Sequence, residues 1–567
     1  MKAKKIISIA VVFISTIFYL TAQDSSVNKN KAEEKIQLPD VTTVVSGDSL
    51  TAGKNSIPDF SEIVPSSSEE SILPKLPDAQ SESVAEEPEA DLSYGSDKAV
   101  YAEGVVGGGY PSFFTGNFSI YKSSGDNPFN LKFSHESANG YGQHSAADGF
   151  YDSTTELSGN KQISFNNTKV NLSALYNTKT DGLQSLSECF YSQTKQNVSA
   201  NCNVEWTLPH DFLITLIGGG EFYSRYEGID SQSQTSYTAQ EAKAPVINLK
   251  PKFNVSWNKN ENSNLSFAFE SIYNFESILG NVEFPAANGE EYTGPTTKYL
   301  NRGIFSLNGI WKNNFASVLG QAALVVGDAL GDPSVIAPFS LDATFYLNQG
   351  STKLGTIRLQ GGLESNVEEY SSLETKYKYT TLSYLPSETS DWFASLNSQV
   401  SLGSNFQLNA SADWKMTAFG NGVWEPVYST KQNCGLYSFE QVDRNLVTTD
   451  IGFSFLYKLL TLDASWKANW LYVPVGQTQY SVGLSASLQK PNGAWGTTLS
   501  MVESLGTDVD LVPIINLTSF FRAGDSIKLG LELNDSVKLF TGKDRAYNNS
   551  EYYYRSGSVT FLVKFFF

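Results

Sequence analysis

The side chains best suited to acid–base chemistry lie around one of the three histidines of the chain. His144 is followed by Ser145, and Asp148 and Asp152 come shortly afterwards. A histidine close to a hydroxyl and a carboxylate can act as a general base toward a nucleophile. The same residue types are ordinary components of polar surface loops, and the other two histidines are predicted in a strand and in a short turn. We therefore predict that the chain has no catalytic residues and is not an enzyme.

Patterns that could bind a metal are equally sparse. Three scattered histidines and no cysteine cluster cannot supply the ligands of a typical zinc site. Acidic residues gather at positions 290–291, 328–332 and 508–510. Such oxygen ligands could hold Ca²⁺, but we interpret these segments as solvated loops. The sequence predicts no metal site and no cofactor.

The composition favours a β-rich protein. The chain has 567 residues, and its 35 Phe and 29 Tyr contrast with 3 Met and 3 His. Aromatic side chains suit pleated sheet surfaces, which argues against most helical enzymes. The net charge of -19, with no basic stripe, argues against nucleic acid as a partner. The three cysteines, Cys189, Cys202 and Cys434, allow at most one disulfide, which is not what holds the fold.

The N-terminus has the pattern of a secretory signal peptide. Lys2, Lys4 and Lys5 precede an uncharged, mostly apolar run over residues 6–20, and Ala22 offers a small residue at the cleavage point. A membrane-spanning anchor needs about 20 apolar residues, whereas this run is shorter and is followed by polar residues. We predict that residues 1–22 are a cleaved signal peptide.

Residues 23–97 form a separate segment that is rich in Ser, Pro, Glu and Asp. It has too little apolar surface to fold, so we predict a disordered acidic tail. One motif recurs in it with prolines 19 residues apart: Leu38-Pro39-Asp40, Ile57-Pro58-Asp59 and Leu76-Pro77-Asp78. Because Pro pre-sets an extended backbone, we consider these motifs candidate docking sites for a periplasmic partner. The alternative is a solvated spacer.

From residue 98 onward the hydrophobic pattern has a period of two. Within residues 129–133, 406–414 and 527–533, for example, apolar residues alternate with polar ones, as in a strand with one apolar and one polar face. The segments run to about ten residues, the length that a tilted strand needs to cross a bilayer. We predict that residues 98–567 form an all-β, antiparallel transmembrane barrel, with its apolar face toward lipid and its polar face toward a wet lumen.

Short and long connections alternate along this region. Short polar turns are predicted at residues 123–127, 166–167, 259–263, 349–352, 491–493 and 523–526. Long polar loops are predicted at residues 139–153, 228–243, 278–296, 368–387, 418–443 and 536–551. Outer-membrane barrels have short periplasmic turns and long extracellular loops, so this alternation predicts the same orientation. Counting the strands gives about 22, within a range of about 18 to 24.

The last strand carries the most specific pattern. Val559, Phe561, Val563, Phe565 and Phe567 occupy every second position, and the sequence ends on an aromatic residue. In this it resembles the bacterial outer-membrane β-barrel class, whose last strand ends in an aromatic residue as a signal that the barrel assembly machinery reads. The resemblance implies an outer-membrane location in a diderm bacterium, contact with outer-membrane lipid, and the barrel assembly machinery as a partner during biogenesis.

The size of the barrel points to a narrower resemblance. A barrel of about 22 strands is the size of TonB-dependent receptors, and residues 37–45 resemble the stretch around the energy-coupling box that opens such receptors. Those receptors carry a folded plug between the box and the barrel, whereas here only the acidic tail occupies that place. The resemblance covers the barrel and not the plug.

The charges expected on the lumen face mix both signs, as at Lys132, Arg358 and Glu532, with no ladder of one charge. An anion pore would carry clustered basic residues, so we expect a path for neutral or polar solutes, or a lumen filled by loops or by the tail. The first hypothesis is a channel or transporter for polar solutes, with the tail as a mobile plug or a coupling and docking segment. The alternative is a non-transporting scaffold in an outer-membrane or surface assembly.

Overall fold

The structure is a computed structural model that describes residues 100–566 with gaps. The gaps are residues 123–126, 188–189, 229–243, 261–262, 277–282, 286–290, 294–297, 328–334, 350–351, 382–387, 404, 421, 433–434, 492, 507–509 and 525. The predicted signal peptide, the acidic tail with its three motifs, and Phe567 lie outside the described residues.

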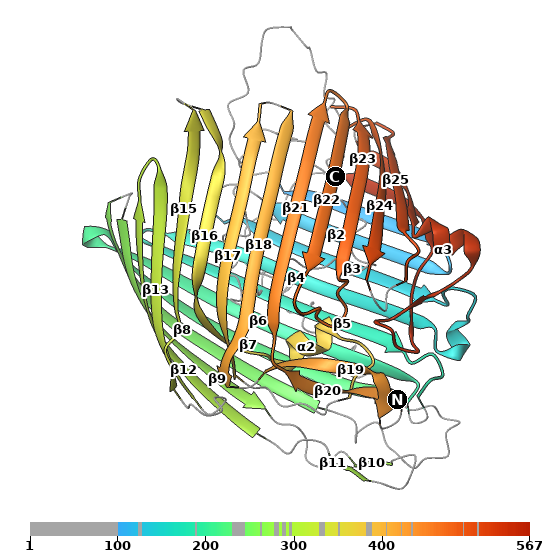
Figure 1. Cartoon of the computed structure of the whole chain (residues 1–567), viewed down its shortest axis with the longest axis horizontal. Coiled ribbons are helices and arrows are strands. Elements are labelled where there is room, and N and C mark those ends of the chain that lie inside the picture. The colour runs from blue at the N-terminus through green and yellow to red at the C-terminus, as the bar shows by residue number, and fades with distance from the viewer. Residues whose placement is uncertain are drawn as a thin grey trace, which may run out of the picture. The chain divides into compact units, whose positions relative to one another are not determined.

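The described residues form a series of long strands joined in hairpins (Figure 1). The first strands are β1 (Tyr101–Tyr110), β2 (Phe113–Lys122), β3 (Phe129–Asn139), β4 (Tyr151–Phe165), β5 (Thr168–Gly182), β6 (Ser192–Leu208), β7 (Phe212–Gly228), β8 (Ala244–Asn260), β9 (Ser263–Glu276), β12 (Lys298–Lys312) and β13 (Ala316–Gly327). They are followed by β14 (Val335–Ile336), β15 (Phe339–Gln349), β16 (Thr352–Val367), β17 (Glu388–Leu402), β18 (Phe406–Gly420), β21 (Asn445–Tyr457), β22 (Leu460–Asn469), β23 (Tyr480–Gln489), β24 (Trp495–Leu505), β25 (Ile514–Arg522), β26 (Ile527–Asn534) and β29 (Ser558–Phe566).

Short elements occupy the connections. Those in the long loops are η2 (Ala146–Asp148), β10 (Glu283–Pro285), β11 (Glu291–Thr293), α2 (Tyr370–Lys376), β19 (Val423–Gln432), β20 (Leu436–Val442), α3 (Ser536–Thr541), β27 (Arg545–Ala546) and β28 (Tyr553–Tyr554). One short turn contains η3 (Pro209–Asp211). Within the described residues no helix is long and apolar enough to span a membrane.

Each long strand pairs antiparallel with the next, and the last strand pairs with the first. Gly107 of β1 lies opposite Thr115 of β2 on one side and Leu562 of β29 on the other, so the sheet closes into a barrel. The sheet has 23 strands, but β14 and β15 both pair with β13 and together fill one position. The described strands therefore occupy 22 positions around the barrel, which confirms the predicted fold class and strand number.

The outer face of the barrel is apolar. Phe114 and Phe118 on β2 and Leu131 and Phe133 on β3 are exposed there. Large aromatic residues are exposed near the short-turn end of several strands: Phe165, Trp206, Phe212, Trp257, Trp311, Phe315 and Tyr457. A soluble protein rarely exposes apolar surface of this extent, whereas a barrel in lipid needs an apolar band flanked by aromatic girdles.

The polar face of each strand lines the lumen. Leu341 and Leu359 are exposed on the outside, at 57% and 46%, so the alternate residues Asp342 and Arg358 point inward. These two side chains form an ion pair at 2.5 Å between β15 and β16. The predicted inward orientation of Arg358 is confirmed.

The two ends of the barrel differ as predicted. β4 and β5 are joined by residues 166–167, and β6 and β7 by η3, whereas loops at the opposite end contain α2, α3 and the β19–β20 hairpin. β1 begins and β29 ends at the short-turn end, where Glu103 lies opposite Phe566. The long-loop end carries most of the residues that are buried in the described structure.

Candidate functional site

One long loop reaches across the lumen. α2 lies between β16 and β17, yet its Glu374 forms ion pairs with Lys195 on β6 and Arg225 on β7. In the order around the barrel, β6 and β16 are separated by β7, β8, β9, β12, β13 and β15. The contact therefore spans the barrel interior, and Figure 1 shows α2 at the long-loop end.

Loops from several positions around the barrel pack together at this end. We call the following segments the loop plug: residues 183–187, 190–191, 368–381, 422–432, 435–444, 470–479 and 535–557. They connect distant strands, since the Gln184 side chain donates to the Tyr553 carbonyl at 2.9 Å and accepts from the Tyr553 N–H at 2.8 Å. Barrels of this width can enclose folded material. Within the described residues that material comes from the barrel's own loops.

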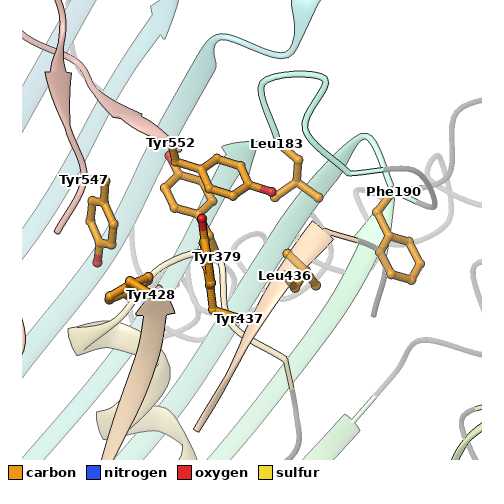
Figure 2. Close-up of a cluster of buried hydrophobic side chains, with 8 residues drawn as sticks. All are labelled: Leu183, Phe190, Tyr379, Tyr428, Leu436, Tyr437, Tyr547 and Tyr552. Atoms are coloured by element: carbon orange, nitrogen blue, oxygen red, sulfur yellow. The ribbon is translucent and has the colours of Figure 1, made fainter. Parts of the chain in front are cut away.

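The centre of the loop plug is a cluster of tyrosines (Figure 2). Tyr379 and Tyr552 stack with their ring centroids 3.9 Å apart, and Tyr547 packs edge-on against Tyr379 at 5.2 Å. Tyr428 and Tyr437 meet edge-on at 5.0 Å. All five side chains are buried. Aromatic pairs of this kind contribute about 0.5–1.5 kcal/mol beyond area burial, so the cluster ties three loops together.

The hydroxyl groups of the cluster also find partners. Tyr552 donates to the Gly435 carbonyl at 3.1 Å, and Tyr428 donates to the Lys378 carbonyl at 3.0 Å. Gly435 has a φ of +82°, and a Cβ atom there would lie 2.3 Å from the Leu186 carbonyl oxygen, so only glycine permits this close approach. Because buried polar groups need such partners, the plug is a packed structure rather than a set of solvated loops.

A second apolar cluster fixes α2 to the barrel wall. Tyr370 and Leu373 of α2, with the adjacent Tyr377, pack against Tyr223 of β7 and Val246 of β8. All five are at most 3% exposed. Fully burying side chains of this size contributes about 1.5–3 kcal/mol each, so the helix is held on the inner face by packing as well as by charge.

Ion pairs join the plug to the wall at several points. They link Glu374 to Lys195 and Arg225, Lys378 to Asp181, Glu369 to Lys250, Arg444 to Asp391, and Arg555 to Glu136 and Asp152. Burial disfavours the charge of Lys378, but Asp181 at 2.8 Å and the nearby Asp152 outweigh it, so the pKa of Lys378 is raised. Removing one partner of a buried pair costs about 3–5 kcal/mol, so the buried pairs of Glu374, Lys378 and Arg444 oppose withdrawal of the loops most strongly.

Carboxyl groups in the loops couple the plug to pH. Burial raises the pKa of Glu368, Glu369, Glu425 and Asp544, although Glu368, for example, accepts the Trp424 N–H at 2.8 Å. A carboxyl group whose pKa rises on folding takes up protons in the folded state. It therefore lowers folded-state stability as the pH rises from about 4.3, its ordinary pKa, through the raised value.

We expect the loop plug to be more stable at pH 5 than at pH 7 for this reason. Hydrogen exchange of residues 435–444, corrected for the intrinsic pH dependence of exchange, should show stronger protection at pH 5. Replacing both Glu368 and Glu425 with Gln should reduce the difference, because two of the carboxyl groups with raised pKa values are then removed. Stronger protection at pH 7 in the parent chain would contradict this expectation.

The structure does not assemble a catalytic triad around His144. Its Nε2 lies 3.2 Å from an oxygen of Asp544, and its ring stacks on Phe150 with centroids 4.0 Å apart. Ser145 donates to Asp148 at 2.8 Å and so leaves the histidine without an adjacent nucleophile. The two remaining histidines lie where the sequence placed them, His135 in β3 and His210 in η3.

The acidic segments considered as calcium sites are not assembled either, as far as they are described. Asp510 lies 2.6 Å from Lys538 Nζ and 3.4 Å from Arg545 Nη1, so protein cations neutralise it. Residues 290, 328–332 and 508–509 lie outside the described residues, as do Cys189 and Cys434. The described part of the chain contains no group of three or more His, Cys, Asp and Glu placed to hold a metal ion, and its one described cysteine, Cys202, is free.

The wall of β5–β7 carries a row of cations that the sequence analysis missed. Lys179 lies directly opposite Lys195, and Lys195 lies directly opposite Arg225. All three point inward, because the alternate residues Val198 and Phe222 are exposed on the outer face, at 43% and 41%. The expectation that the lumen has no ladder of one charge is therefore wrong. The sequence contained a signal for this pairing. In a hairpin without a bulge, residues at equal distances from the turn lie opposite each other, and Lys195 and Arg225 are equally far from the short turn between β6 and β7.

Comparison with known proteins gives a likeness of fold. No family model and no curated protein matches the sequence. Among solved structures, the chain is similar to the FrpB iron transporter from Neisseria meningitidis (F5-1 variant), with a TM-score of 0.59, 9% identity, and 83% of each chain covered. It is also similar to the siderophore receptor PirA from Acinetobacter baumannii, with a TM-score of 0.59, 10% identity, and 82% and 80% covered.

The copper transporter OprC gives a third match, with a TM-score of 0.59, 10% identity, and coverage of 83% of this chain and 80% of that one. At these identities the likeness concerns the fold. The chain thus has the large β-barrel fold of these outer-membrane receptors and transporters, as the strand count indicated.

Proposed function

We propose that this chain is an outer-membrane transporter for polar solutes whose extracellular entrance is closed by the loop plug. The observation that carries the proposal is the closed barrel of 22 positions, apolar outside and polar inside. In lipid, every backbone polar group must be paired internally, which only helices and closed barrels achieve. The similar structures of FrpB, PirA and OprC, which are named as transporters and a receptor for iron, siderophores and copper, support a transport role.

The proposed location is the outer membrane of a diderm bacterium, with the acidic tail in the periplasm. The predicted signal peptide provides export, and the apolar outer face provides the lipid contact. The alternating residues Val559 to Phe567 would recruit the barrel assembly machinery. The short-turn end, where β1 begins and β29 ends, would then face the periplasm.

The inner wall supports a polar solute. On β5 and β6, Asn171 faces Asn203 and Ser173 faces Asn201. Such amide and hydroxyl groups can replace part of the hydration shell of a polar solute. The cationic row described above adds charge to this wall near the loop plug.

The tail is proposed as a coupling or docking segment. Its three motifs would give several low-affinity contacts a high effective concentration for a periplasmic partner or for the lumen. We expect each motif to matter modestly and all three together strongly. The test replaces the prolines with Gly and the aspartates with Ser at Pro39, Asp40, Pro58, Asp59, Pro77 and Asp78. Unchanged cross-linked partners and unchanged conductance would reduce the tail to a spacer.

A specific observation also favours the alternative of a non-transporting scaffold. The loop plug is held by buried tyrosines and by ion pairs such as Lys378–Asp181, and a plug of this kind could be permanent. The two functions differ in whether solute enters the barrel once the plug is released.

Solute entry into proteoliposomes distinguishes them. Lys378→Met removes the cation that lies 2.8 Å from the buried Asp181 and leaves this carboxylate with the wall charges of Lys179 and Lys195. Breaking a buried pair costs up to about 3–5 kcal/mol, so the plug should weaken and swelling in a small neutral sugar should accelerate. Lys431→Met is the matched control, because Lys431 pairs with Glu551, which is 66% exposed, and exposed pairs contribute about 0–1 kcal/mol. If Lys378→Met makes the loops sensitive to protease and admits no solute, the scaffold function is correct.

A further inference from the structure

The row of Lys179, Lys195 and Arg225 places like charges opposite each other on adjacent strands. Directly opposed side chains of antiparallel strands have Cβ atoms about 4.5–5.5 Å apart, and like charges in these positions are destabilising. The side chains of Lys195 and Arg225 are 7% and 1% exposed, so solvent screens them little. A buried group of this charge is tolerated only when an anion compensates it.

Glu374 supplies that anion. Arg225 Nη1 donates to its two carboxylate oxygens at 3.0 and 2.9 Å, and Lys195 Nζ lies 3.2 Å from Oε2. Lys195 also donates to the carbonyls of Glu374 and Tyr377 at 2.5 and 3.0 Å, and Arg225 donates to the Thr380 carbonyl at 2.5 Å. The carboxylate and three carbonyl oxygens of one loop therefore surround the two cations as a bound ligand would.

Glu374 is attached to the protein less firmly than the two cations that it contacts. Glu374 belongs to a helix of seven residues in a loop, whereas Lys195 and Arg225 lie in strands of 17 residues that pair on both sides. Withdrawal of the plug would remove Glu374 and leave the cations in place. Asp181 of the wall also remains when Lys378 withdraws with the loop, and it offsets one of the three positive charges.

We infer that Lys179, Lys195 and Arg225 form an anion-binding site on the solute path, which Glu374 occupies as a stand-in while the barrel is closed. This inference rests on the proposed transport function and names the solute class: polar molecules that carry carboxylate or phosphate groups. Such a solute competes with Glu374 for the row. Because it binds only the barrel whose plug has withdrawn, it shifts the population toward the open state.

The test measures binding of citrate, as the probe, to the full purified chain by calorimetry at low ionic strength. Glu374→Ala empties the site, and Glu374→Gln does so while keeping the shape of the side chain. Either variant should bind citrate at least about tenfold more tightly than the parent, since the competing carboxylate is gone. Adding Lys195→Gln and Arg225→Gln to Glu374→Ala should abolish the gain.

Glu388→Ala is the matched control. Glu388 and Arg302 form a buried pair at 2.8 Å with side chains 1% and 3% exposed, so this variant frees one buried cation outside the row. It should show no tenfold gain, which separates the row from any unpaired buried cation. Equal citrate binding by Glu374→Ala and by the triple variant would overturn the inference and assign Glu374 to a structural latch.

The ion selectivity of channels in planar bilayers shows whether the proposed anion site or the proposed transport function is wrong. Channels opened by Glu374→Ala should prefer anions, and channels of the triple variant should not. An open Glu374→Ala channel without anion preference overturns the anion site and leaves the transport function standing. Citrate binding is measured without any need for conductance. A barrel that binds citrate as expected but never conducts would therefore contradict the transport function and leave the anion site standing.

Discussion

Replacing Phe565 and Phe567 with Asp is expected to remove the protein from the outer membrane. β29 closes the barrel, and Phe565 lies opposite Gly104 of β1 and Ile527 of β26. Its side chain belongs to the outward set, in which Phe561 is 63% exposed. Charged residues on the lipid face destabilise barrels, and the change also destroys the proposed terminal assembly signal. We expect membrane levels to fall strongly, because the barrel then lacks both a lipid-compatible last strand and the proposed terminal signal, and barrels that are not assembled do not accumulate in the membrane.

Quantitative immunoblots of outer-membrane fractions, with heat modifiability as the sign of a folded barrel, measure this effect. The control places the same two charges on the lumen face of the same strand, as Leu562→Asp with Phe566→Asp. The Phe566 ring lies beside the inward-facing Lys564, whose Nζ is 5.1 Å from the ring centroid. The control should assemble better than the lipid-face variant. Parental levels of the lipid-face variant would remove the basis for the proposed signal.

The second large effect is expected from Tyr379→Ala combined with Tyr552→Ala. Their stacked rings are 2% and 0% exposed and join the loop after β16 to the loop after β26. Truncating a buried aromatic residue costs about 3–5 kcal/mol, and the two losses are not additive because the rings touch. The strand ladders are untouched, so we expect an intact barrel with a released loop plug.

Limited proteolysis and hydrogen exchange of the loops check this expectation. Residues 422–432 and 535–557 should become cleavable and lose exchange protection, while the barrel stays heat-modifiable. Tyr457→Ala is the control, because Tyr457 is 52% exposed at the opposite end of β21. Loops that stay protected in the double variant would show that the tyrosine cluster does not hold the plug.

The barrel could be predicted from the sequence because the patterns that specify it lie within single strands and in the turns between consecutive strands. Alternation within segments such as residues 406–414 identifies a strand face, and short turns such as residues 166–167 set the register of the next strand. Neighbouring strands in the sequence are neighbours in the barrel. A meander therefore needs no long-range information beyond its closure, in which the last strand pairs with the first.

The loop plug could not be predicted in the same way. Its contacts join residues far apart in the chain, such as Gln184 with Tyr553 and Glu374 with Arg225, and loops have no hydrophobic period that reports them. One signal was present: the long loops contain tyrosines such as Tyr379, Tyr437 and Tyr552. Aromatic residues are costly to leave in water, so their frequency in connections indicates packing rather than solvation.

We propose that a conductive lumen lies behind a closure made by the barrel's own loops. Single-channel recording in planar bilayers tests it directly, with the parent chain, a chain lacking residues 23–97, and a chain in which residues 370–380 and 423–442 are replaced by short Gly-Ser linkers. The loop replacements should raise the mean conductance at least about tenfold over the parent, because a barrel of this width without a plug encloses a water-filled channel. Loss of the tail alone should change it much less. A loop-replaced barrel that is heat-modifiable and still silent would contradict the account.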